Sequence, residues 1–118
     1  MMYNSKPLIF ISAPYRAGTD SSLFDNANFV RILAIDIWQQ GGVAVAPHLN
    51  SFMLGGLVPE EGFLQGYCDL LRRCDAVLFA GLYEQSEGCQ MELQAAKDSN
   101  IPQLFSVKEA REFIQNWT

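Results

Sequence analysis

A glutamate near the start of a predicted helix is the residue of this chain best placed to do chemistry. Ser86 is a good N-cap residue, and Gly88 and Glu92 follow it at helical spacing. The free N–H groups and positive dipole of a helix start favour an anion, and Gly88 would let a ligand approach the backbone. Glu92 lies one turn further along the same face. A lone glutamate here is more often a solvated helix residue, so its role depends on its neighbours.

The chemistry open to such a carboxylate is nucleophilic attack on a sugar. Glu92 could attack C1′ of a nucleoside and form a glycosyl-enzyme through an oxocarbenium-like transition state. Asp69, on the preceding predicted helix, could protonate the departing base, and Tyr15 could hold the Glu92 carboxylate in line. The structural alternatives are a surface pair of Asp69 with Arg72 and a half-buried loop aromatic at Tyr15.

A second group of residues could hold the ligand. The loop that begins at Ser12 contains Pro14 and Arg16, and Arg16 could bind a 5′-phosphate or hydroxyl together with the Ser86 hydroxyl and the Gly88 N–H. His48 follows a short apolar run, where it could also simply cap the end of a strand.

Continuous apolar runs predict strands that are buried on both faces of a parallel sheet. They are residues 8–12, 43–46, 76–80 and, shorter, 103–105. Helices are predicted between and after them, at about 22–40, 60–73, from Ser86 to before Asn100, and from the Ser106–Glu109 capping box onward. Residues 49–59, with two adjacent glycines and a proline, are predicted to form a loop.

This alternation predicts an α/β fold: one domain over residues 1–118, with a doubly wound, Rossmann- or flavodoxin-like parallel sheet of about four strands. In the commonest small arrangement the strand order is 2-1-3-4, and ligands bind beyond the carboxyl ends of the strands where the winding reverses. We therefore expect the loop after residue 12 to lie beside the loop of residues 81–88.

Composition narrows the possible functions. A net charge of −5 over 118 residues disfavours a polynucleotide or an anionic membrane as partner. One histidine and three cysteines without Cys-x-x-Cys spacing give no metal site and no disulfide framework. No long apolar run or signal peptide is found, so we expect a cytoplasmic protein. Glycine-rich nucleotide motifs are absent, and we expect no cofactor.

Several segments carry a resemblance to a known family. They are Phe10-Ile-Ser-Ala-Pro-Tyr-Arg16, Ala46-Pro-His48, Asp69-Leu-Leu-Arg-Arg-Cys-Asp75, Ser86-Glu-Gly-Cys-Gln-Met-Glu92 and Asn100-Ile-Pro102. Together they resemble the nucleoside 2-deoxyribosyltransferase superfamily, in particular a branch common in bacteria and their phages. The resemblance covers residues 8–106.

The resemblance implies roles for individual residues. Glu92 would be the nucleophile, Asp69 would assist at the base, and Tyr15 would orient the nucleophile. A serine at the position of Ser86 is similar to deoxynucleoside 5′-monophosphate N-glycosidases rather than to the transferases. Arg16 and His48 would then lie near the phosphate, and subunits would pair as a homodimer.

Two functions from different classes therefore stand after the sequence alone. One is an enzyme that cleaves, or transfers across, the N-glycosidic bond of nucleosides or nucleoside 5′-monophosphates. The other is a module that binds a nucleotide or nucleotide-derived signal without cleaving it. A purely structural interaction domain would leave the loop carboxylates unexplained.

Overall fold

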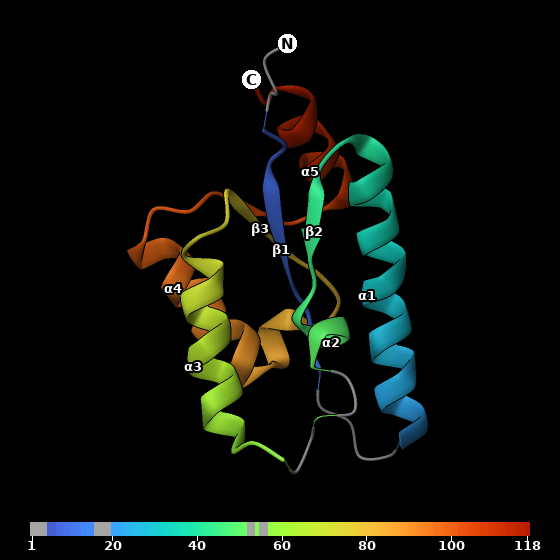
Figure 1. Ribbon diagram of the computed structural model, residues 1–118, viewed down its shortest axis with the longest axis vertical. Helices are drawn as coiled ribbons and strands as arrows, with labels where there is room; N and C mark the ends of the chain where they lie inside the picture. The colour runs from blue at the N-terminus through green and yellow to red at the C-terminus, as the bar shows by residue number, and fades with distance from the viewer. Residues whose placement is uncertain (1–4, 16–19, 52–53, 55–56) are drawn as a thin grey trace.

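The chain folds around one parallel sheet whose strand order is β2-β1-β3-β4 (Figure 1). The computed structural model describes residues 5–15, 20–51, 54 and 57–118. The strands are β1 (Leu8–Ser12), β2 (Val43–Val45), β3 (Ala76–Phe79) and β4 (Gln103–Leu104). All three strand pairings are parallel. The predicted α/β fold and the predicted 2-1-3-4 order are both confirmed.

Helices cover both faces of the sheet. They are α1 (Asp20–Gln40), α2 (Pro47–Asn50), α3 (Glu60–Leu71), α4 (Glu87–Asp98) and α5 (Val107–Gln115), with a 3₁₀ turn η1 (Tyr83–Gln85). Helices α1 and α5 pack on one face, and α3 and α4 pack on the other. Right-handed crossovers between parallel strands give this two-sided arrangement.

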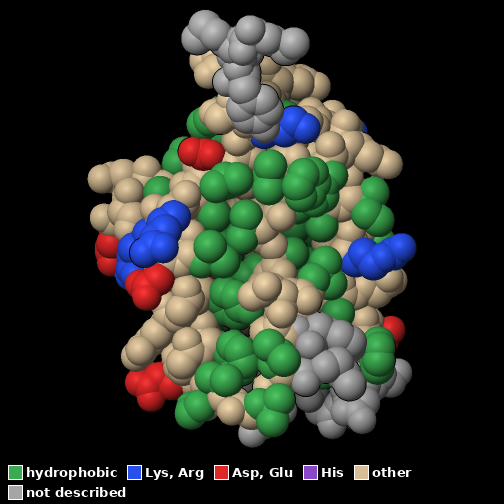
Figure 2. All heavy atoms as spheres, in the orientation of Figure 1, with side chains coloured by type: hydrophobic (Ala, Val, Ile, Leu, Met, Phe, Trp, Pro, Cys, Tyr) green, Lys and Arg blue, Asp and Glu red, His purple; other side chains and the backbone are tan. Residues whose placement is uncertain are grey.

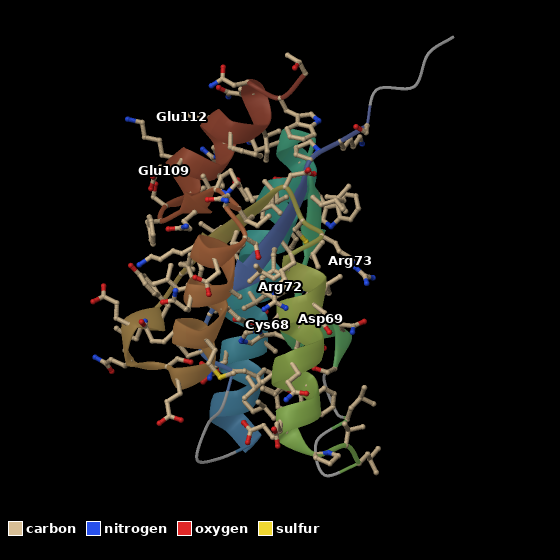
Figure 3. The ribbon with its side chains drawn as sticks, turned by 90° about the vertical axis from the view of Figure 1, so that its left-hand side faces the viewer. Cys68, Asp69, Arg72, Arg73, Glu109 and Glu112 are labelled. Atoms are coloured by element: carbon tan, nitrogen blue, oxygen red, sulfur yellow. The ribbon has the colours of Figure 1, made fainter. Side chains whose placement is uncertain are left out.

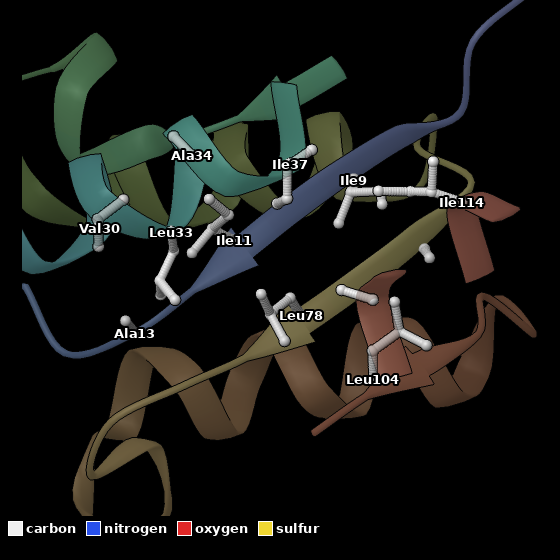
Figure 4. Close-up of a cluster of buried hydrophobic side chains, with 12 residues drawn as sticks. Ile9, Ile11, Ala13, Val30, Leu33, Ala34, Ile37, Leu78, Leu104 and Ile114 are labelled. Atoms are coloured by element: carbon white, nitrogen blue, oxygen red, sulfur yellow. The ribbon is translucent and has the colours of Figure 1, made fainter. Parts of the chain in front are cut away.

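The side chains of β1 alternate between two hydrophobic clusters, as the period of a strand requires. Ile9 and Ile11 pack with Val30 of α1 and Ile114 of α5 (Figure 4). Phe10 points to the other face, into the cluster beneath α3 and α4. Because β1 is buried on both sides, its sequence reads as a continuous apolar run rather than an alternating one.

The strand order creates the reversal point expected from the sequence. β1 pairs with β2 on one side and with β3 on the other, and Ser12 lies opposite Phe79 in the register. The carboxyl ends of β1 and β3 therefore meet at one edge of the sheet. The segments that follow them, residues 13–15 and 80–86, begin side by side there.

Serine caps begin the two helices nearest the carboxyl end of the chain. Ser86 Oγ accepts a hydrogen bond from the Cys89 N–H at α4, and Ser106 Oγ accepts one from the Glu109 N–H at α5. The Glu109 carboxylate in turn accepts from the Phe105 N–H, one residue before the N-cap, in a variant of the predicted capping box. The predicted starts of both helices are confirmed.

Two local predictions were wrong. The stretch predicted to form a loop from residue 49 contains the end of α2, a single turn that begins at Pro47, where proline suits the first helical position. Trp38 recurs at helical spacing with the apolar residues of α1, which predicts a place on its inner face, but it is 53% exposed. Apolar residues occur on more than one side of α1, so periodicity alone does not identify its inner face.

Hydrophobic side chains gather on the face that carries the edge strand β2, between α1 and α3 (Figure 2). Large exposed apolar residues of these helices include Ile35, Trp38 and Leu70. The expected homodimer stays a prediction, and this face is a natural place to look for a subunit contact.

Within the part of the chain that the structure describes, none of the helices combines the length and apolar composition needed to cross a bilayer.

Candidate active site

A cavity of about 1100 Å³ opens at the carboxyl edge of the sheet. Its described walls come from four segments that are distant in sequence: residues 13–15 after β1, 47–51 around α2, 58–67 leading into and along α3, and 81–92 from the loop after β3 into α4. Asn26 and Phe29 of α1 complete the wall. The predicted site at the winding reversal therefore coincides with a cavity large enough for a nucleoside-sized ligand.

Glu92 is the acidic side chain that the fold buries in this wall. It is 9% exposed, and its Oε1 accepts a hydrogen bond of 2.7 Å from Ser12 Oγ. Burial raises the pKa of Glu92 from its ordinary value of 4.5 to about 7, while the Ser12 hydrogen bond acts in the opposite direction. A carboxyl group with such a pKa can be either ionised or protonated near neutral pH.

The Ser12–Glu92 contact follows from the sheet topology. Ser12 is the last residue of β1 and is 1% exposed, so its hydroxyl needs a partner within the protein. Glu92 comes from the second turn of α4, the helix that follows the neighbouring strand β3. Ser12, predicted to bind substrate, is not among the residues that border the cavity, and its hydroxyl holds the Glu92 carboxylate.

The start of α4 borders the cavity, but its capping serine and its glycine also make contacts within the protein. Ser86 lines the cavity, but its Oγ already accepts from the Cys89 N–H at 3.2 Å. A Cβ on Gly88 would lie 3.3 Å from Leu64 Cδ2. The absence of a side chain at Gly88 therefore lets α3 pack close to the start of α4, and Gly88 also borders the cavity. Glu87 places a further acidic group in the first turn of α4.

Tyr15, Pro14 and His48 form a connected part of the wall. The ring of Tyr15 meets the ring of His48 edge-on, with centroids 4.9 Å apart. His48 Nε2 lies 2.9 Å from the Pro14 carbonyl oxygen. The hydrogen bond to Glu92, expected from Tyr15, comes from Ser12 instead. Burial and the neighbouring Tyr67 raise the pKa of the Tyr15 phenol, which stays protonated at neutral pH.

Asp69, the predicted general acid, is not among the residues that border the cavity. Its side chain is 70% exposed and pairs with Arg72 at 3.0 Å on the surface of α3 (Figure 3). The structure therefore has the alternative arrangement, an exposed ion pair between Asp69 and Arg72 three positions apart on the helix. The α3 residues that border the cavity are Glu60, Phe63, Leu64 and Tyr67.

Arg16, predicted to bind a phosphate, lies outside the described residues, as does the rest of the loop over 16–19. Among the described residues of the cavity wall, none is a lysine or an arginine. Burial lowers the pKa of His48, so the imidazole is neutral near pH 7. The described wall therefore offers hydrogen-bonding groups rather than positive charge to a ligand.

Sequence reasoning missed the contribution of α2 and of the residues that anchor it. The Pro47 carbonyl accepts hydrogen bonds from Ser51 Oγ at 3.0 Å and from the Tyr67 hydroxyl at 3.3 Å. These contacts tie the turn that carries His48 to α3. The sequence signal was Pro47 itself, a favourable first residue for a helical turn.

The thiol at the cavity wall is a weak candidate for chemistry. Cys89 is 2% exposed, and burial raises the pKa of its thiol, so little thiolate forms at neutral pH. In the described part of the chain, no three His, Cys, Asp or Glu side chains lie close enough together to hold a metal ion. The chemistry of the site therefore depends on its carboxyl, hydroxyl and imidazole groups.

A family model described as Domain of unknown function (DUF7768) matches residues 7–106. The chain belongs to this family. The match spans all four strands and the cavity walls, and ends at Ser106, the N-cap of α5. No curated protein matches the chain.

Proposed function

We propose that the protein is an N-glycosidase that acts on nucleosides or nucleoside 5′-monophosphates, with Glu92 as the nucleophile. The observation that carries the proposal is a buried carboxyl group held by Ser12 in a nucleoside-sized cavity at the reversal point of the sheet. The resemblance of the Ser86–Glu92 and Ser12–Arg16 segments to nucleoside 2-deoxyribosyltransferases supports the same assignment.

The reaction divides into two displacements. In the first, a Glu92 carboxylate oxygen attacks C1′, the C1′–N bond breaks, and its electron pair leaves with the base, which takes up a proton. In the second, water attacks C1′, loses a proton and releases the Glu92 carboxylate. The sum is nucleoside plus water giving free base plus sugar. An acceptor base in place of water would give transfer instead.

We look for the acid that protonates the base in the cavity wall, because Asp69 does not border the cavity. Glu60 and Glu87 both border the cavity. Separate Glu60→Gln and Glu87→Gln variants identify the donor, because loss of the acid slows substrates with poor leaving groups most strongly. Equal slowing of all substrates would assign the residue a structural role.

The test is base release, measured by chromatography. Wild-type protein and Glu92→Gln are incubated with ribo- and deoxyribonucleosides and with their 5′-monophosphates. We expect release by the wild type and loss of release in Glu92→Gln. Glu112→Gln on the exposed surface of α5 is the matched control and should keep wild-type activity. Undiminished base release by Glu92→Gln would show that Glu92 is not the nucleophile.

The position of Asp69 favours a second candidate function. Without the predicted acid at the cavity, the site has a smaller set of catalytic groups, and the protein could bind a nucleoside or nucleotide without cleaving it. Saturable binding of one compound in the panel, with no base released from any, would support this binding module and reject the enzyme.

A further inference from the structure

His48 is the residue of the cavity wall whose hydrogen bonding the protein leaves incomplete. Its side chain is buried, at 4% exposed, and it borders the cavity. Among the side chains that the structure describes, Nδ1 of His48 is the buried nitrogen or oxygen atom without a hydrogen-bond partner. Buried polar atoms are nearly always paired, so an orphaned one in a cavity wall points to a partner supplied by a ligand.

The contact on the other side of the ring fixes what kind of partner this is. A carbonyl oxygen can only accept a hydrogen bond, so the 2.9 Å contact with the Pro14 oxygen places a hydrogen on Nε2. Burial favours the neutral imidazole. A neutral ring with its hydrogen on Nε2 has a bare lone pair on Nδ1, which makes Nδ1 an acceptor.

The surroundings hold the ring in this state. His48 lies in the α2 turn, which Ser51 and Tyr67 anchor through the Pro47 carbonyl, and the Tyr15 ring packs edge-on against the imidazole. Rotation of the ring to exchange its two nitrogens would break the contact with Pro14. The orientation of the acceptor is therefore set before a ligand arrives.

We propose that His48 is a specificity-determining residue whose Nδ1 accepts a hydrogen bond from an N–H or O–H group of the bound nucleoside. This inference rests on the proposed function for the class of ligand, and it revises the expected role of His48, which the sequence placed near a phosphate. A neutral acceptor repels a phosphate oxygen and attracts a donor. The donor is either the amino group of the base or the 2′- or 3′-hydroxyl group of the sugar.

A double-mutant comparison tests the contact by binding rather than by turnover. The Glu92→Gln background is titrated with adenosine, with purine riboside (no amino group), and with the 2′-deoxy and 3′-deoxy analogues of adenosine. His48→Gln keeps an amide donor near the Nε2 position but has no acceptor at Nδ1. We expect His48→Gln to weaken adenosine binding about tenfold to a hundredfold and to leave binding of one analogue unchanged. That analogue identifies the donor.

His48→Asn is the matched variant, because its amide oxygen can take the Nδ1 position while the contact with Pro14 is lost. We expect it to recover part of the affinity for adenosine. Equal weakening of all four compounds by His48→Gln would show a structural role and overturn the inference.

Nuclear magnetic resonance of the imidazole gives a second readout, and its signals are unambiguous because the chain has a single histidine. We expect an Nε2–H tautomer at pH 7 and a change in the Nδ1 shift on adenosine binding. A hydrogen on Nδ1, or an Nδ1 shift that adenosine does not move, would overturn the inference. Binding with the expected His48 effects but without base release from wild-type protein would reject only the N-glycosidase, whereas no binding of any nucleoside would reject both proposals.

Discussion

Replacing Ser12 with alanine should shift the ionisation of Glu92 to higher pH. The Ser12 hydroxyl donates the 2.7 Å hydrogen bond to the Glu92 carboxylate in a buried environment. This bond stabilises the ionised carboxylate, whereas burial opposes ionisation and dominates. Without the hydroxyl, burial acts alone, and the pKa of Glu92 rises further.

The size of the effect follows from the strength of a hydrogen bond to a charged group. Such a bond contributes about 1.5 kcal/mol or more, and 1.4 kcal/mol corresponds to a factor of about ten in proton affinity. With a wild-type pKa of about 7, half of Glu92 is ionised at pH 7. In Ser12→Ala the ionised fraction at pH 7 should fall to about a tenth.

The direct assay is a carboxyl ¹³C titration of the folded protein between pH 4 and 9, with the Glu92 resonance assigned from its disappearance in Glu92→Gln. Base release provides a second assay. If ionised Glu92 is the nucleophile, kcat/KM rises with pH through the pKa of Glu92, and in Ser12→Ala this rise moves to higher pH. At pH values well above the new pKa, the activity of the variant should approach that of the wild type.

Ser51→Ala is the matched control, because it removes another buried serine hydroxyl at the cavity, one that donates to the Pro47 carbonyl instead of Glu92. It should leave the Glu92 titration in place. A wild-type Glu92 that titrates near its ordinary value of 4.5 would refute the burial argument. An unchanged titration in Ser12→Ala would refute the role assigned to the hydrogen bond.

Three further predictions follow from the same structure. Between pH 4.5 and about 7, the folded protein binds more protons than the unfolded chain, because Glu92 is still protonated in the folded state. The free energy of unfolding of the wild type therefore falls as the pH rises through this window. In urea unfolding, Glu92→Gln should be about 3 kcal/mol more stable than wild type at pH 8 and about equally stable at pH 4. Gly42→Ala should lower the free energy of unfolding by about 1 to 3 kcal/mol in denaturant, because its Cβ would lie 3.1 Å from Ile114 Cδ1. Gly66→Ala should instead raise it by up to about 1 kcal/mol through helix propensity, since no atom lies within 4 Å of the added Cβ. Asp69→Asn should change stability by no more than about 0.5 kcal/mol and leave base release unchanged, and a loss of activity above tenfold would restore Asp69 to the mechanism.

Much of the fold could be predicted because its local signals agree with one another. The apolar runs of β1 and β3 identify strands buried on both faces, and Ser86 and Ser106 identify helix starts through the hydrogen bonds that a serine cap makes. The predicted strand order came from the commonest arrangement of small α/β sheets, and the structure has that order. The location of the cavity was predictable for the same reason, since parallel strands bring the segments after β1 and β3 to one edge.

The error at Asp69 could have been avoided from the sequence. The apolar spacing of the predicted helix over residues 60–73 puts Phe63 and Tyr67 on its inner side, and a residue two positions after Tyr67 lies about 200° around an α-helix. Asp69 therefore had to face away from whatever Tyr67 faces. The predicted role of Asp69 rested on its residue type, its place on the preceding helix and the family resemblance, and none of these determines the side of a helix.

The sequence by itself predicted the four strands, the longer helices and Glu92 as the central carboxyl group, and the commonest arrangement of small α/β sheets supplied the strand order. Only the tertiary structure decided that Ser12 rather than Tyr15 holds Glu92, that Leu64 fills the space beside Gly88, and that His48 has an unpaired acceptor. Local sequence fixes hydrogen bonds within a few residues, because the backbone itself sets their geometry. The Ser12–Glu92 contact spans 80 positions, and its geometry depends on how α4 packs against the sheet.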